Sequence, residues 1–106
     1  MERRTSDRIV VNLKAERISC IENCSVFIEN LSENGIYMIT APSRKNSFTP
    51  GTELELELEL STEKSINLNC NVKWAHKNEH DDLTHSVGLE IIEPPQEYKD
   101  FITNLN

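Results

Sequence analysis

The chain has 106 residues, of which 37% are hydrophobic and 27% are charged, and its formal net charge is −7. These values are typical of a soluble globular protein with a single domain, residues 1–106, and they argue against a disordered chain. No apolar run approaches the roughly 20 residues that span a bilayer, and no apolar signal segment follows Met1–Arg4. We therefore expect a cytoplasmic protein without membrane insertion.

Basic residues are concentrated at the start of the chain. Five of the 11 lysines and arginines fall in the first 17 residues, and the rest of the chain holds 6 basic and 15 acidic residues, a net charge of −9. General nucleic-acid binding needs a basic surface that neutralises phosphates, so the acidic balance argues against it. A local basic segment suits a small anionic ligand better.

Taken in order, the chain predicts six strands. Residues 1–8 are polar and arginine-rich, and we expect them to form a ligand-binding arm. From Ile9 onward, apolar and polar residues alternate with the period of 2 that is typical of a strand. Strand-like runs cover residues 9–16, 25–28, 36–40, 52–60, 66–74 and 86–92.

The run at residues 52–60 is the clearest strand. Four leucines alternate there with four glutamates. Both residue types favour helices, but strict alternation would scatter the leucines around a helix. The period therefore outweighs the propensity and predicts a strand with one buried leucine face.

The end of the chain predicts a helix. Pro94-Pro95 ends the last strand, and in 96–105 apolar residues recur at helical spacing, at Tyr98, Phe101, Ile102 and Leu105. The elements together predict a mainly all-β fold, a six-stranded antiparallel β-barrel with a short C-terminal α-helix over one mouth or flank. Trp74 could stack a base, but a tryptophan that closes an apolar face is more often part of the core, and we expect that role here.

Two short motifs carry the chemistry, Arg4-x-x-x-Arg8 and the segment Asn30–Gly35, with the pattern N-x-S-x-x-G, which we call the polar turn. Each motif alone is weak evidence for a binding site, because lone arginines are usually solvated and such turns are common. Arginine grips phosphate oxygens, bonds the guanine O6/N7 edge or stacks on purines. Asn30 and Ser32 add directional hydrogen-bonding groups, and Gly35 can adopt a positive φ. Together the motifs predict one site for an anionic purine.

The motifs, in this order and spacing, resemble the PilZ domain family, bacterial receptors for cyclic di-GMP. Val72-x-Trp74 at the end of a strand and Val87-Gly88-Leu89 before the helix agree with that family, so the resemblance covers nearly the whole chain. It implies a six-stranded barrel that binds cyclic di-GMP, often as an intercalated pair of ligands, with the arginine arm wrapped around the nucleotide.

The resemblance also implies roles for individual residues. Arg4 and Arg8 are expected to contact phosphates and guanine, and Arg3, next to the first motif, is a lesser candidate. Asn30 and Ser32 would bond a guanine edge. The set of expected ligand-binding residues is completed by Gly35, which would shape the turn.

We therefore interpret the chain as a cyclic di-GMP receptor or adaptor, not an enzyme, that relays the second messenger to a partner protein through ordering of the N-terminal arm. The alternative is a PilZ-like adaptor in pilus or motility machinery that binds no nucleotide, although such an adaptor has no physical need for both motifs. An unrelated barrel that binds single-stranded nucleic acid would need a basic face rich in aromatic residues, whereas this chain is 6% aromatic.

Metal binding and catalysis have weaker support, and we expect no metal and no cofactor. Cys20, Cys24, His76, His80 and His85 match no compact zinc pattern. Nothing in the sequence places a cysteine nucleophile, a base and oxyanion donors together. The odd number of cysteines favours free thiols.

Overall fold

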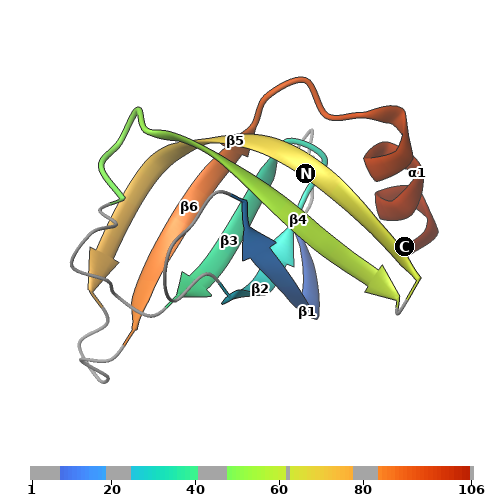
Figure 1. The fold of residues 1–106 in the computed structure, drawn as a ribbon, viewed down its shortest axis with the longest axis horizontal. Helices are drawn as coiled ribbons and strands as arrows, with labels where there is room; N and C mark the ends of the chain where they lie inside the picture. The colour runs from blue at the N-terminus through green and yellow to red at the C-terminus, as the bar shows by residue number, and fades with distance from the viewer. Residues whose placement is uncertain (1–7, 19–24, 41–47, 62, 78–83, 106) are drawn as a thin grey trace, which may run out of the picture.

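Six strands form a closed antiparallel barrel, and one helix follows them (Figure 1). The computed structural model describes residues 8–18, 25–40, 48–61, 63–77 and 84–105. The elements are β1 (Ile9–Arg17), β2 (Ser25–Leu31), β3 (Gly35–Thr40), β4 (Glu53–Ser61), β5 (Lys64–Lys77), β6 (His85–Ile91) and α1 (Gln96–Leu105). The predicted fold class is confirmed.

The strands follow the order β1-β2-β3-β6-β5-β4 around the barrel, and β1 closes it by pairing with β4. The seam between these two strands is short and consists of the pairs that Ala15–Arg17 make with Leu56–Leu58. The longest pairing joins β4 and β5, from Glu53 opposite Asn71 to Ser61 opposite Lys64. The first strand therefore pairs with β2 along most of its length and with β4 at its C-terminal end.

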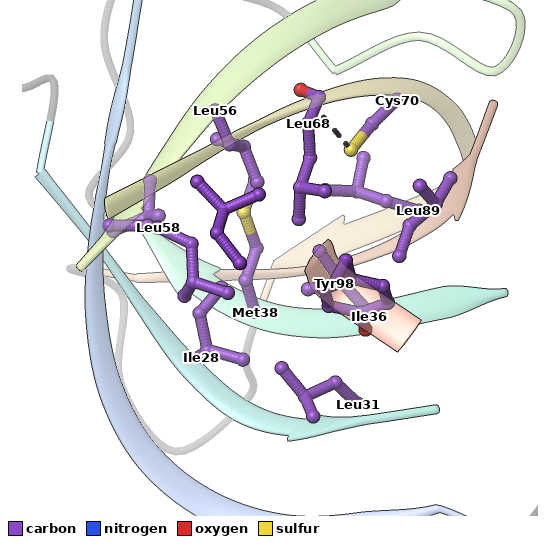
Figure 2. Packing of buried hydrophobic residues seen from close by; sticks show 14 of the residues in the cluster. Ile28, Leu31, Ile36, Met38, Leu56, Leu58, Leu68, Cys70, Leu89 and Tyr98 are labelled. Atoms are coloured by element: carbon purple, nitrogen blue, oxygen red, sulfur yellow. Dashed lines mark hydrogen bonds between the residues drawn. The ribbon is translucent and has the colours of Figure 1, made fainter. Parts of the chain in front are cut away.

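The barrel interior is filled by the inward faces of the strands (Figure 2). In β4, Leu56 and Leu58 are fully buried, while Leu54 and Leu60 are partly buried and pack against the core. Each fully buried leucine stabilises the fold by about 1.5–3 kcal/mol relative to an exposed one. The leucine face predicted from alternation is therefore the core face of β4.

The helix α1 lies at one end of the barrel (Figure 1). It is held by Tyr98 and Ile102, which are buried, with Phe101 partly buried against the core. Figure 2 shows the Tyr98 ring among the buried side chains of the barrel. The predicted helix agrees with the observed one in both bounds, and it packs over one end of the barrel as expected.

A bulge in β2 extends that strand beyond its predicted end. The register with β3 shifts between Ile28 and Asn30. Strict alternation would place Ile28 and Leu31 on opposite faces, yet both are fully buried, because the extra residue of the bulge restores Leu31 to the core face. The polar turn therefore begins inside β2 and ends at the first residue of β3.

A second bulge moves Trp74 out of the core. The register of β5 against β6 shifts between Val72 and Trp74. Val72 is buried, whereas Trp74 is 40% exposed, so the prediction that Trp74 closes an apolar core face was wrong. The strand continues to Lys77 and includes His76, so it extends beyond its predicted end at residue 74.

Candidate functional site

The structure brings the second arginine of the first motif to the polar turn. Arg8 directly precedes β1, and Val10 of that strand lies opposite Asn30 of β2. From this position Arg8 Nη1 donates a hydrogen bond of 2.7 Å to Asn30 Oδ1. Two residues separated by 22 positions in the chain are thus in direct contact. Arg3 and Arg4 lie outside the described residues.

Ser32 lies at the tight part of the polar turn. Only 5% of its surface is exposed. Its N–H donates to the Gly35 carbonyl at 2.9 Å, and its Oγ lies 3.6 Å from the position that a Cβ on Gly35 would occupy. Ser32 and Gly35 therefore form one compact unit beside Arg8 and Asn30.

Gly35 lies where neighbouring atoms leave little space for a side chain. A Cβ there would lie 3.2 Å from the Leu89 carbonyl oxygen and 3.9 Å from Arg8 Nη2. The expectation that Gly35 uses a positive φ was wrong, because Gly51 is the glycine of the described chain with that conformation, at 95°. Gly35 instead allows close approach between the polar turn, β6 and the Arg8 guanidinium.

The polar turn is also held from the C-terminal part of the chain. The Ile91 N–H at the end of β6 donates to the Asn34 carbonyl at 2.8 Å, and Tyr98 Oη donates to the Ser32 carbonyl at 2.6 Å. Burial raises the pKa of the Tyr98 phenol, and Cys70 and Glu33 raise it further. The phenol therefore stays protonated and keeps its role as a donor.

A row of paired residues continues from the polar turn around the outer wall of the barrel. We define this outer row as Val10, Asn30, Tyr37, Gly88 and Trp74, in which each residue lies opposite the next on the neighbouring strand. Adjacent strands are about 4.8 Å apart. Asn30 and the aromatic residues of the row therefore belong to one continuous surface.

Three rings form what we call the aromatic patch, Tyr37, Trp74 and His76. The Trp74 and His76 rings are stacked, with centroids 5.2 Å apart and an interplanar angle of 15°. Tyr37 and Trp74 are tilted at 49°, with centroids 5.5 Å apart. The indole covers Gly88 so closely that a Cβ on this glycine would collide with Trp74 Cε2.

The aromatic patch was not part of the predicted site. A glycine inside a strand often marks a close approach of another group, and Gly88 was the one available signal. The bulge before Trp74 turns the indole outward. The alternation of apolar and polar residues does not predict this bulge.

The assembled groups suit an anionic purine ligand. Arg8 supplies charged donors in a planar fork, Asn30 supplies an amide, and the neighbouring rings offer stacking surfaces. The hydrogen bond between Arg8 and Asn30 fixes the direction of the guanidinium without neutralising it, because its partner is an uncharged amide. The positive charge therefore remains available to a ligand.

Within the described ranges, no three His, Cys, Asp or Glu side chains are grouped to hold a metal ion, and Cys20, Cys24 and His80 lie outside those ranges. Burial raises the pKa of the Cys70 thiol to about 12, which leaves it protonated and unreactive. The one described helix is too short to cross a bilayer.

The closed barrel, with an arginine and a polar turn at one end of its wall, defines a small β-barrel module with the elements of a ligand site. A model of the PilZ domain matches residues 2–105. The chain belongs to the PilZ domain family.

The chain is similar in fold to several solved structures, including the three that follow. The PilZ domain with c-di-GMP of YcgR from Escherichia coli is 11% identical, with a TM-score of 0.73, and the match covers 98% of this chain and 92% of that one. The K. pneumonia MrkH–c-di-GMP complex is 15% identical, with a TM-score of 0.75 and 99% of this chain covered. The Bacillus subtilis inhibitor of motility, MotI/DgrA, is 20% identical, with a TM-score of 0.73 and 96% covered.

At these identities the likeness establishes the common fold. The chain spans about half the length of two of these proteins, 48% of the motility inhibitor and 51% of MrkH. No curated protein matches the chain.

Proposed function

We propose that this chain is a receptor for cyclic di-GMP that binds the nucleotide at Arg8 and the polar turn and relays its presence to a partner protein. The observation that carries the proposal is the contact between Arg8 Nη1 and Asn30 Oδ1 at 2.7 Å, which brings one residue of each motif together. Two structures of similar fold are described as containing c-di-GMP, which supports the choice of ligand.

The proposed roles follow from the chemistry of each group. Arg8, with Arg4 and Arg3 of the arm, contacts the phosphates and stacks on guanine or bonds its O6/N7 edge. Asn30 and Ser32 hydrogen-bond a guanine edge. Gly35 keeps the space between them open, since a side chain there would point toward Arg8 and Ser32.

Binding at this place connects the arginine arm with the barrel wall. Residues 1–8 then lie against the polar turn, with the ligand held between two segments that are far apart in the sequence. A surface composed of arm, ligand and barrel differs from that of the barrel alone, and a partner protein can distinguish them. Support for a protein partner comes from the similarity to a motility inhibitor.

Isothermal titration calorimetry with cyclic di-GMP tests the proposal. Arg8→Ala is expected to weaken binding about 10- to 100-fold, because hydrogen bonds to charged groups are worth about 1.5–3 kcal/mol. Arg8→Lys keeps the charge but lacks the planar fork, and we expect it to restore only part of the affinity. Lys64→Ala is the matched control, since Lys64 is an exposed cation at the start of β5.

The outcomes separate the parts of the proposal. Equal binding by wild type and Arg8→Ala would remove the arginine from the site. A wild-type protein that gives no heat with cyclic di-GMP would favour the alternative, an adaptor that binds proteins without nucleotide. Equal losses in Arg8→Ala and Lys64→Ala would indicate a general charge effect rather than a specific contact.

A further inference from the structure

A buried hydrogen bond joins the polar turn to the helix α1 in the C-terminal part of the chain. Tyr98 Oη donates to the Ser32 carbonyl at 2.6 Å, across 66 positions in the sequence. Tyr98 is fully buried, so water cannot replace the phenol as the partner of this carbonyl. Losing the hydroxyl would leave a buried acceptor unsatisfied.

The helix has few other attachments. Tyr98 and Ile102 are its buried side chains, and most of its remaining residues are exposed. Its first turn is closed by the Tyr98 and Lys99 N–H groups, which both donate to the Pro95 carbonyl. Among the described residues, α1 is fixed to the barrel by the side chains of Tyr98 and Ile102 and by the partly buried Phe101, so the Tyr98 hydrogen bond is one of few attachments.

A second connection reinforces the first. The Ile91 N–H donates to the Asn34 carbonyl, and Ile91 ends the strand that leads into α1. The polar turn is therefore held at Ser32 by the helix itself and at Asn34 by the strand before it. A shift of α1 necessarily changes the environment of the turn.

We infer that Tyr98 is a positioning residue for the candidate site, and that it couples docking of α1 to the conformation of the polar turn. Tyr98 acts through Ser32, whose carbonyl it fixes while the Ser32 Oγ and N–H lie on the side of Gly35. The helix and the turn then behave as one unit whose order changes together.

Coupling of this kind is reciprocal. If an attached α1 holds the turn in the form that binds ligand, a bound ligand must in turn stabilise the attachment of α1 by the same free energy. The part of this inference that concerns a ligand rests on the proposed function, with cyclic di-GMP as the ligand. The part that concerns the helix and the turn does not need any ligand.

Amide hydrogen exchange of the full chain, followed by NMR, tests the inference with Tyr98→Phe. This variant keeps the buried ring and removes only the hydroxyl. We expect the Ser32 and Ile91 amides to exchange about tenfold faster than in the wild type, which is the size of effect of one unsatisfied buried acceptor. The Val72 amide, which donates to Thr52, reports on general destabilisation and should change less.

The matched control is Thr103→Ala. It removes the bond from Thr103 Oγ1 to the Lys99 carbonyl, an exposed hydrogen bond on the same helix. We expect the exchange of the Ser32 amide to stay at the wild-type rate in this variant. If Thr103→Ala loosens the helix and the Ser32 amide still exchanges at the wild-type rate, loss of helix order alone does not affect the turn. The effect of Tyr98→Phe is then assigned to the lost hydroxyl.

Cyclic di-GMP then tests the reciprocal effect in the wild-type protein. We expect saturating ligand to slow exchange of the α1 amides about fivefold or more, and Tyr98→Phe to weaken binding about tenfold with Thr103→Ala unchanged. The wild-type measurement remains decisive if Tyr98→Phe does not fold.

The results discriminate between this inference and the proposed function. Wild-type exchange rates at Ser32 in folded Tyr98→Phe would overturn the inference, as would tight ligand binding that leaves α1 exchange unchanged. If wild type binds no cyclic di-GMP, the proposed function fails, while faster exchange confined to the turn in Tyr98→Phe still supports the coupling.

Discussion

Trp74 reaches the outer wall because of two neighbouring details of the backbone. The bulge in β5 reverses the phase of alternation after Val72, and the missing side chain of Gly88 leaves a space that the indole covers. The indole is then flanked by Tyr37 and His76. A large apolar ring that is 40% exposed, in the same row as Asn30, has the position of a stacking surface for a bound base.

We predict that Trp74→Ala weakens cyclic di-GMP binding by about 5- to 150-fold, because stacking of one base on an aromatic ring is worth about 1–3 kcal/mol. Trp74 is the single tryptophan of the chain, so titration of wild type with ligand should also change the intrinsic fluorescence. Phe27→Ala is the matched control, since Phe27 is an exposed aromatic residue, 47% accessible, outside the outer row. Equal affinities of wild type and Trp74→Ala would exclude stacking on this ring.

The residues of the candidate site differ in how far the sequence could predict their position. Arg8, Asn30 and Ser32 belong to motifs whose side chains have few other reasons to occur together, and the structure places them within one contact region. Gly35 was expected to shape the turn through a positive φ, whereas the structure shows a close approach to the Leu89 carbonyl, which lies far along the chain. Trp74 was assigned to the core because the alternation of apolar and polar residues does not reveal the extra residue of a bulge.

At the scale of elements, β4 is the simplest case. Its register with β5 is regular from Glu53 to Glu59, so its leucines stay on one face throughout. In β2 and β5, a bulge changes which of the following residues face the core. The sequence therefore predicted the existence of all six strands, whereas their ends and faces depended on partners that local patterns do not contain.

We predict that Leu56→Ala lowers the free energy of unfolding by about 2–5 kcal/mol, because the fully buried side chain leaves a cavity in the barrel core. Glu59→Ala, on the exposed face of the same strand, should change it by less than about 0.5 kcal/mol. Urea denaturation followed by circular dichroism measures both values. Similar losses for the two variants would contradict the assignment of faces in β4.

At the scale of the whole molecule, burial of protonated groups makes the fold sensitive to alkaline pH. Burial raises the pKa of the Cys70 thiol from 9.0 to about 12, and the pKa of the Tyr98 phenol is raised above 10.0. Below pH 9.0 both groups are protonated in the folded and the unfolded chain. Above it, the unfolded chain loses a proton that the folded chain keeps, so stability falls as pH rises.

We predict that the free energy of unfolding decreases between about pH 9 and pH 12, with a slope that approaches 1.4 kcal/mol per pH unit for the thiol. Urea denaturation at a series of pH values measures this slope. Cys70→Ala should lower stability at pH 8 yet show a shallower decline from pH 9 to pH 10, the range below the ordinary phenol pKa. An identical decline in both proteins would assign the pH dependence to other groups.

The polar turn has all its hydrogen-bond and packing partners only when the last strand and the helix are present. The turn is formed by residues of the first third, but its partners Leu89, Ile91 and Tyr98 belong to the last strand and the helix. Contacts of such long sequence separation form late, because the intervening chain loses conformational freedom when they close. During synthesis, the polar turn therefore emerges early but acquires its hydrogen bonds to the C-terminal part only when Ile91 and Tyr98 are available. A newly made chain can therefore complete this turn only after residues 91–98 have been synthesised.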